Sequence, residues 1–119
     1  MIKNSVLIVI LLCVLTAGCT TTQKQYYFGD YSNTLYDFEK DKSEETLAEH
    51  KEQLEHIVSE SKEKSIHVPP GIYAELGYIY LKENKPKEAI AFFKKESVLY
   101  PESKQFMDRL IQRSCNEKI

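Results

Sequence analysis

The sequence contains few residues of several types. Its 119 residues include no Trp, four Gly, four Pro and three Cys. So little Gly and Pro excludes the collagen-like and Gly-rich low-complexity classes. The formal net charge is −2, whereas nucleic-acid-binding domains usually carry a basic face, so we expect no nucleic-acid partner. A chain of this length forms one domain at most, which is too small for an enzyme with an interdomain cleft.

The one long apolar run lies at the N-terminus. Lys3 precedes the unbroken apolar residues 6–15. A helix needs about 20 residues to span a bilayer, so this run instead fits the apolar region of a secretory signal. It leads into Leu15-Thr16-Ala17-Gly18-Cys19, which resembles the bacterial lipobox.

The lipobox implies a cleaved and lipidated protein. We expect residues 1–18 to be removed as a lipoprotein signal peptide. Cys19 then carries diacylglycerol and an N-acyl chain such as palmitate, and residues 19–25 form the anchor and tether. Thr20, rather than Asp, follows the lipidated residue. By resemblance to lipoprotein sorting, this favours the periplasmic face of the outer membrane of a Gram-negative cell.

Few thiols remain after this processing. Cys13 leaves with the signal peptide and Cys19 is acylated, so Cys115 is the remaining thiol. An odd thiol in an exported protein is either free or paired with another chain.

Apolar spacing predicts that residues 26–114 form one all-α domain. Tyr31, Leu35 and Phe38 follow the i, i+4, i+7 spacing of one helical face. The predicted helices cover residues 31–40, about 44–62, 71–83, 87–100 and about 103–114.

Side chains that can cap helices precede the first two predicted helices. Asp30 is predicted to be the N-cap of the first. The second can begin with a capping box formed by Asp41 and Glu44, or with Ser43 as the cap.

Residues 70–103 fit a 34-residue period and resemble a tetratricopeptide repeat. The matching positions are Tyr73, Leu76, Gly77, Tyr80, Ala89, Phe93 and Pro101. The resemblance implies that Gly77 and Ala89 are small because two helices cross there, and that Pro101 ends the pair. Glu96 stands at a position that is normally small, which predicts looser packing onto the following helix.

The repeat does not recur upstream. The residues 34 positions before Tyr73, Leu76 and Gly77 are Glu39, Lys42 and Ser43. The first two helices therefore form at best a degenerate hairpin, and we expect a short TPR-like α-solenoid of about five helices.

Further motifs identify most of residues 26–111 as similar to a family of bacterial lipoproteins. They are Tyr26-Tyr27-Phe28-Gly29-Asp30-Tyr31-Ser32, Leu35-Tyr36, Val68-Pro69-Pro70-Gly71, Tyr73-Ala74-Glu75 and Pro101-Glu102-Ser103. That family carries the domain of unknown function 4810. The resemblance implies neighbouring lipoproteins similar to the curli secretion channel, hence an envelope assembly, and it supplies no catalytic residue.

The titratable residues do not suggest metal or catalytic chemistry. His50 and His56 are six residues apart and point to different faces of a helix, and His67 lies elsewhere. The pairs Glu75 with Glu83 and Glu44 with Glu45 are expected to be solvated. We therefore expect no metal, no further cofactor and no enzymatic activity.

The tetratricopeptide resemblance implies a binding surface on the first helix of the repeat. The residues at its concave positions are Ala74, Tyr78, Leu81 and Lys82. Tyr78 stands where carboxylate-clamping members have Asn, so an aromatic or apolar contact is expected. Alternatively, Tyr78 and Leu81 pack against the upstream helix.

The aromatic-rich segment is a second candidate surface. It includes Tyr26, Tyr27, Phe28 and Tyr31, and extends to Tyr36. Aromatic residues with polar tips suit interfaces, so this segment could dock a partner lipoprotein. The favoured alternative is that it closes the open end of a short helical stack.

These observations predict an adaptor that joins envelope proteins, in a secretion-channel-like or cell-wall-associated complex. One alternative is a pilotin-like chaperone that escorts a channel subunit to the outer membrane. The other is a peptidoglycan-associated activator of cell-wall synthesis.

Overall fold

A computed structural model describes residues 1–3 and 25–116. Residues 25–116 contain five α-helices and no strand, which confirms the predicted all-α fold. The elements are α2 (Tyr31–Lys40), α3 (Glu44–Glu63), α4 (Ile72–Lys82), α5 (Pro86–Leu99), the short 3-10 helix η1 (Pro101–Ser103) and α6 (Lys104–Asn116). The predicted lipobox, Cys19 and tether residues 19–24 lie outside the described residues. None of the helices in the described ranges is long and apolar enough to cross a membrane.

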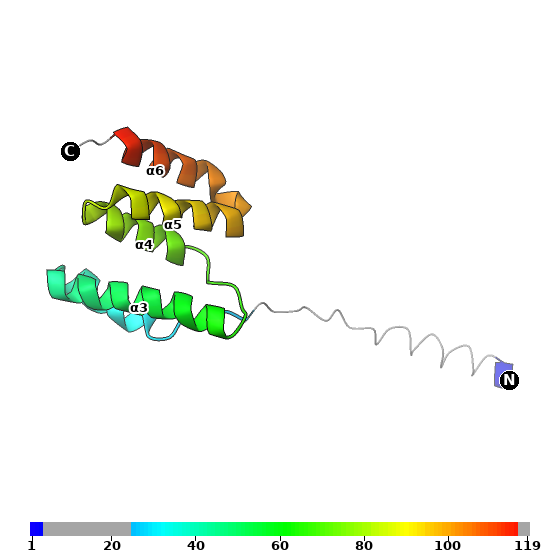
Figure 1. Ribbon diagram of the computed structural model, residues 1–119. Helices are drawn as coiled ribbons and strands as arrows, with labels where there is room; N and C mark the ends of the chain where they lie inside the picture. The colour runs from blue at the N-terminus through cyan, green and yellow to red at the C-terminus, as the bar shows by residue number, and fades with distance from the viewer. Residues whose placement is uncertain (4–24, 117–119) are drawn as a thin grey trace.

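The helices stack in the order of the chain (Figure 1). α2 and α3 form a pair at one end, α4 and α5 form the central pair, and α6 lies at the other end. The main contacts join α2 to α3, α3 to α4, α4 to α5 and α5 to α6. The first pair and α6 are therefore the two ends of the stack.

An apolar cluster joins the first helix pair to α4. Its buried members are Leu54, Ile57, Val68, Ile72, Leu76 and Ile79. Ile72, Leu76 and Ile79 are spaced four and three residues apart, so they share the face of α4 that meets α3. Burying each such side chain contributes about 1.5–3 kcal/mol, which makes this cluster the main attachment between the pairs.

A second cluster joins α4, α5 and α6 around Ala89, Phe93 and Met107. At its centre α4 and α5 approach closely. A Cβ atom on Gly77 would lie 2.5 Å from Cε1 of Phe93 and 3.1 Å from the carbonyl oxygen of Ala89. The Phe93 ring therefore occupies the space that any larger residue at position 77 would need.

Aromatic rings pack beside this crossing. Tyr73 and Tyr80 of α4 both pack against Phe92, and their ring centroids lie 6.1 Å and 5.2 Å from the Phe92 centroid. Pro101 follows α5 directly and begins η1. The residues of the predicted repeat thus lie within or beside the α4–α5 hairpin.

The first turns of α2 and α3 differ in their capping. Ser43 caps α3, because its Oγ accepts a hydrogen bond from the backbone N–H of Thr46 at 3.2 Å. Asp30 makes no side-chain cap to α2. Asp30 does occupy the predicted N-cap position, but its carboxylate accepts from Nδ2 of Asn33 at 2.6 Å and from no first-turn amide.

Glu96 connects the two helices of the central pair. Its side chain is buried, and Oε1 accepts a hydrogen bond from the backbone N–H of Gly71 at 2.7 Å. Gly71 has a φ of +91°, which favours glycine, and it immediately precedes α4. The packing at Glu96 is therefore tighter than expected, because its carboxylate is buried where it accepts the hydrogen bond from Gly71.

The Gly77→Leu substitution should strongly lower stability. Overpacking a close-packed core costs about 1–3 kcal/mol, and here the Ala89 backbone blocks the simplest relief. Thermal unfolding followed by circular dichroism measures the effect. Ala91→Leu, at an exposed position of α5, is the control. Equal melting temperatures for the two variants would contradict the close helix crossing.

Candidate functional site

A groove runs between the first helix pair and α4. It consists of a hollow of about 370 Å³ that adjoins one of about 540 Å³, and the two share Glu44, Leu47 and Lys82. The first is also lined by Phe38, Glu39, Lys42, Ser43 and Tyr78. The second is also lined by Ala48, Lys51, Glu52, Glu55 and Glu83. Three helices therefore contribute to one open, elongated site.

The narrower hollow is partly apolar. Phe38 and Leu47 are half-buried, whereas the Tyr78 side chain is 51% exposed. Nζ of Lys82 lies 4.9 Å from the centre of the Tyr78 ring, a cation–π distance. This end of the groove offers an aromatic surface next to a positive charge.

The wider hollow is rich in charge. Nζ of Lys51 donates to Glu83 at 2.7 Å and lies 4.0 Å from the centre of the Tyr80 ring. The Tyr80 hydroxyl donates to Glu55 at 2.9 Å, and this hydrogen bond raises the pKa of Tyr80. Hydrogen bonds from Lys51 and Lys85 lower the pKa of Glu83, which therefore stays ionised. The wall of this hollow thus combines the Lys51–Glu83 ion pair with further acidic side chains.

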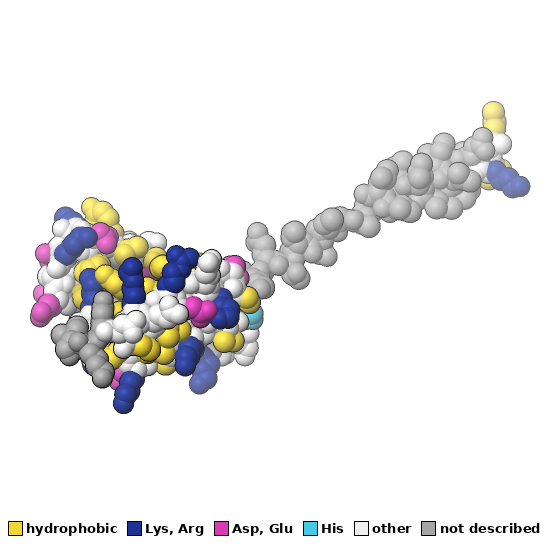
Figure 2. All heavy atoms as spheres, turned by 90° about the horizontal axis from the view of Figure 1, so that it is seen from above, with side chains coloured by type: hydrophobic (Ala, Val, Ile, Leu, Met, Phe, Trp, Pro, Cys, Tyr) yellow, Lys and Arg dark blue, Asp and Glu magenta, His cyan; other side chains and the backbone are white. Residues whose placement is uncertain are grey.

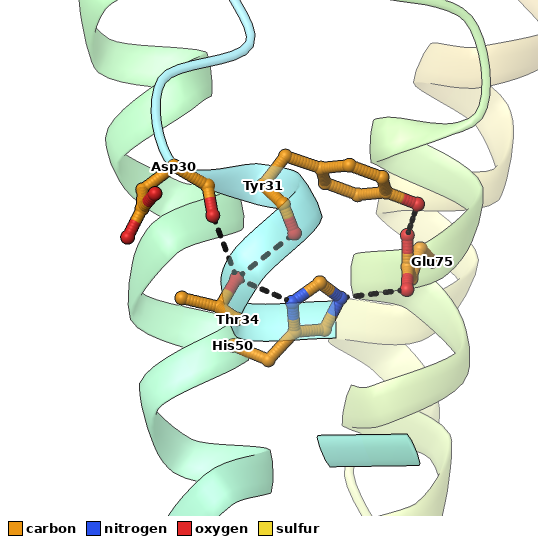
Figure 3. Close-up of polar contacts among 5 residues, drawn as sticks. All are labelled: Asp30, Tyr31, Thr34, His50 and Glu75. Atoms are coloured by element: carbon orange, nitrogen blue, oxygen red, sulfur yellow. Dashed lines mark hydrogen bonds and ion pairs between the residues drawn. The ribbon is translucent and has the colours of Figure 1, made fainter. Parts of the chain in front are cut away.

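A polar network beside the groove joins α2, α3 and α4 (Figure 3). Nε2 of His50 lies 2.8 Å from Oε1 of Glu75, and Nδ1 lies 2.9 Å from the Thr34 hydroxyl. The Tyr31 hydroxyl donates to the other Glu75 oxygen at 3.1 Å. Burial and the neighbouring Glu75 carboxylate raise the pKa of Tyr31 to about 12, so the hydroxyl keeps its proton.

The network is satisfied with His50 either neutral or charged. A neutral imidazole donates from Nε2 to Glu75 and accepts at Nδ1 from Thr34. An imidazolium donates from both nitrogens, and the Thr34 hydroxyl then donates to the Tyr31 carbonyl oxygen, 3.2 Å away. These hydrogen bonds therefore join α2, α3 and α4 in either state of His50.

The same hydrogen-bond network also positions one wall of the groove. The Phe38 ring lies parallel to His50, with an interplanar angle of 3° and centroids 6.4 Å apart. Tyr31 lies against the same imidazole at 5.4 Å. Because Phe38 also lines the narrower hollow, the position of that wall depends on His50.

The structure divides the four predicted residues of the concave surface. Tyr78 and Lys82 line the groove. Ala74 and Leu81 pack instead against the second cluster, on the side of α4 that faces Phe93 and Met107. Only the first two are therefore available to a ligand in the groove.

The aromatic segment that precedes α2 is also divided. Tyr27 and Tyr31 pack against the first apolar cluster, and Tyr27 lies edge-on to His56 at 5.8 Å. Tyr26 is half-buried, and the Phe28 side chain is 48% exposed. Of these four aromatic side chains, only Phe28 is exposed, and the others pack within the domain.

Sequence reasoning missed His50 and misplaced Glu75. Glu75 was expected to be solvated, but it is half-buried and forms hydrogen bonds with the buried His50 and the half-buried Tyr31. His50 stands in a stripe with Leu47, Leu54 and Ile57, at spacings of three, four and three. A polar residue within an apolar stripe requires a buried partner, and this signal could have identified the network.

The other candidate ligands remain separate. His56 and Cys115 are exposed, and Glu83 lies at the opposite end of α4 from Glu75. In the described part of the chain, no group of three or more His, Cys, Asp or Glu residues could hold a metal ion.

Comparison with known proteins identifies one family. Residues 25–110 match the family model described as Domain of unknown function (DUF4810). Neither the curated proteins nor the solved structures contain a match.

The Glu75→Ala substitution should destabilise the domain more than Glu83→Ala. Loss of Glu75 leaves the buried His50 and the Tyr31 hydroxyl without their acceptor, which costs about 1–3 kcal/mol. Glu83 binds Lys51 and Lys85 at the surface, where an ion pair contributes about 0–1 kcal/mol. Urea denaturation of both variants measures the difference. Equal losses in the free energy of unfolding would show that the Glu75 network stabilises the domain no more than a surface ion pair does.

Proposed function

Because the chain belongs to the DUF4810 family, whose description states no activity, we propose its function from the groove. The protein is a lipid-anchored adaptor that binds a segment of another envelope protein between the first helix pair and α4. The half-exposed Tyr78, in an open groove beside Phe38 and Lys82, carries this proposal.

The chemistry of the groove suits a polypeptide ligand. Phe38, Leu47 and Tyr78 provide an apolar patch at one end of the groove, and charged side chains line the rest. Protein interfaces likewise combine aromatic residues with polar surroundings. Volumes of about 370 and 540 Å³ also fall in the range of about 300–1,000 Å³ typical of binding clefts.

The helix packing supports a TPR-like solenoid as the scaffold for this groove. The close crossing of α4 and α5 at Gly77 and Ala89 is the packing that the repeat resemblance implies. In tetratricopeptide proteins the first helix of each repeat lines the binding surface. Here α4 holds that position, and Tyr78 and Lys82 lie on its groove side.

The lipid anchor completes the proposed mechanism. Acylation of Cys19 would hold the domain at the periplasmic face of the outer membrane, within the short reach of residues 20–25. A partner held in the same membrane then experiences a high local concentration, so weak contacts are enough. By the family resemblance, channel-like lipoproteins similar to the curli secretion channel are the expected partners.

A photoreactive phenylalanine analogue at position 78 should crosslink the lipidated protein to an envelope protein in membranes. The same analogue at position 98 is the matched control, because Val98 is 80% exposed on α5, away from the groove. Mass spectrometry of the crosslinked products identifies the partner. Equal crosslinking at both positions, or none at position 78, would overturn the adaptor proposal.

The same partner separates the adaptor from a chaperone. Deleting the protein should leave the membrane location of an adaptor's partner unchanged, whereas a pilotin's client would be mislocalised. Co-sedimentation with purified peptidoglycan sacculi, without any crosslinked protein, would favour the cell-wall alternative.

The Cys19→Ala variant should leave the outer-membrane fraction, because the acyl chains provide the stable attachment. Cys115→Ala, which removes the exposed thiol of α6, should stay in that fraction. Density-gradient fractionation followed by immunoblotting tests both variants. If Cys19→Ala stays with the outer membrane, the anchor is misassigned.

A further inference from the structure

The last helix presents a mixed aromatic and basic face at its end of the stack. Phe106, Arg109 and Arg113 are spaced three and four residues apart, so they lie on one side of α6. All three are exposed, and the Phe106 side chain is 58% exposed. Figure 2 views the molecule from the α6 side and shows basic side chains around apolar ones.

The two arginines of this face have no ion-pair partner in the part of the chain that the structure describes, and the nearby Asp108 binds Lys104. A guanidinium group binds carboxylates through two parallel hydrogen bonds. The face therefore suits an acidic surface that also accepts an aromatic ring.

The opposite end of the same molecule has that character. Glu45, Glu49 and Glu52 follow the i, i+4, i+7 spacing on α3, and all are exposed. None of them forms an ion pair with another described residue. Residues 30–64 contain eleven acidic and five basic residues, whereas residues 86–116 contain four acidic and six basic residues. The charge is thus separated between the two ends of the stack.

We propose that the α6 face of one copy docks on the outer face of α3 in a second copy. Arg109 and Arg113 are four residues apart, as are Glu45 and Glu49, and four residues rise about 6 Å along either helix. Two guanidinium groups can therefore meet two carboxylates at the same spacing. Phe106 then lies beside a hollow of about 300 Å³ lined by Glu49, Glu52, Gln53 and His56.

This contact joins unlike surfaces, so a docked pair of copies still has one free face of each kind. Such heterologous contacts build open chains or rings rather than closed dimers. The two docking faces lie at the ends of the stack, whereas Tyr78 lies in the groove between the helix pairs. Glu52 also lines the larger hollow of the groove, but Glu45 and Glu49 do not, so reversing their charge leaves the groove lining unchanged.

Charge reversal tests the proposal on the full chain in detergent. The first variant is Arg109→Glu/Arg113→Glu, and the second is Glu45→Arg/Glu49→Arg. Lys87→Glu/Lys94→Glu makes the same charge change as the first variant on exposed residues of α5 and is the control. Sedimentation velocity over a range of concentrations at low and high salt measures association, and circular dichroism checks that each variant is folded.

The native chain should associate at low salt and dissociate at high salt, because exposed charges are screened within about 8 Å at 0.15 M salt. Each reversed variant alone should associate at least about tenfold more weakly. An equimolar mixture of the two should recover association, because each contact then joins opposite charges again. A monomeric native chain at low salt, association in the variants equal to that of the control, or a mixture without recovery would each overturn the proposal. Crosslinking at position 78 should be unchanged in both variants, which separates this result from failure of the adaptor proposal.

Discussion

The way in which three helices pack depends on hydrogen bonds to one carboxylate. Glu75 of α4 accepts hydrogen bonds from His50 of α3 and from Tyr31 of α2. A buried polar group costs free energy unless it is paired, so α2 can pack closely on α3 and α4 only where all three groups meet. Phe38 stacks on His50, and the wall of the groove follows from that contact. The shape of the groove thus depends on a hydrogen-bond network whose residues do not line it.

Burial of the apolar core stabilises the domain but does not by itself fix the orientation of the first helix pair on α4. The cluster around Leu54 and Leu76 attaches the first helix pair to α4, but apolar contacts tolerate small shifts in register. The Phe93 ring against Gly77 is more restrictive, because it fixes the distance between α4 and α5. Steric fit therefore sets the distance between α4 and α5, and hydrogen bonds set the orientation of the first helix pair on α4. Both constraints meet on α4, which carries Tyr78 into the groove.

Local sequence patterns were enough to locate the helices but only part of the site. The predicted helix at about 44–62 is observed at Glu44–Glu63, because the stripe through Leu54 and Ile57 and the cap at Ser43 are local signals. Tyr78 and Lys82 were found through their positions in the repeat. Their partners in the groove come from other helices, whose approach depends on long-range packing. The position of His50 in an apolar stripe indicates a buried partner, but the partner Glu75 lies 25 residues away, so no local spacing identifies it.

The hydrogen bond from Gly71 to Glu96 affects how the domain folds. The first free amide of α4 is satisfied by a side chain that arrives only when α5 has docked. An isolated α4 segment of eleven residues is also shorter than the length at which helices become stable in water, about 12–15 residues. The two helices therefore form and open as one cooperative unit. Hydrogen exchange at the Gly71 amide reports that opening, because its hydrogen bond to Glu96 breaks when the two helices separate.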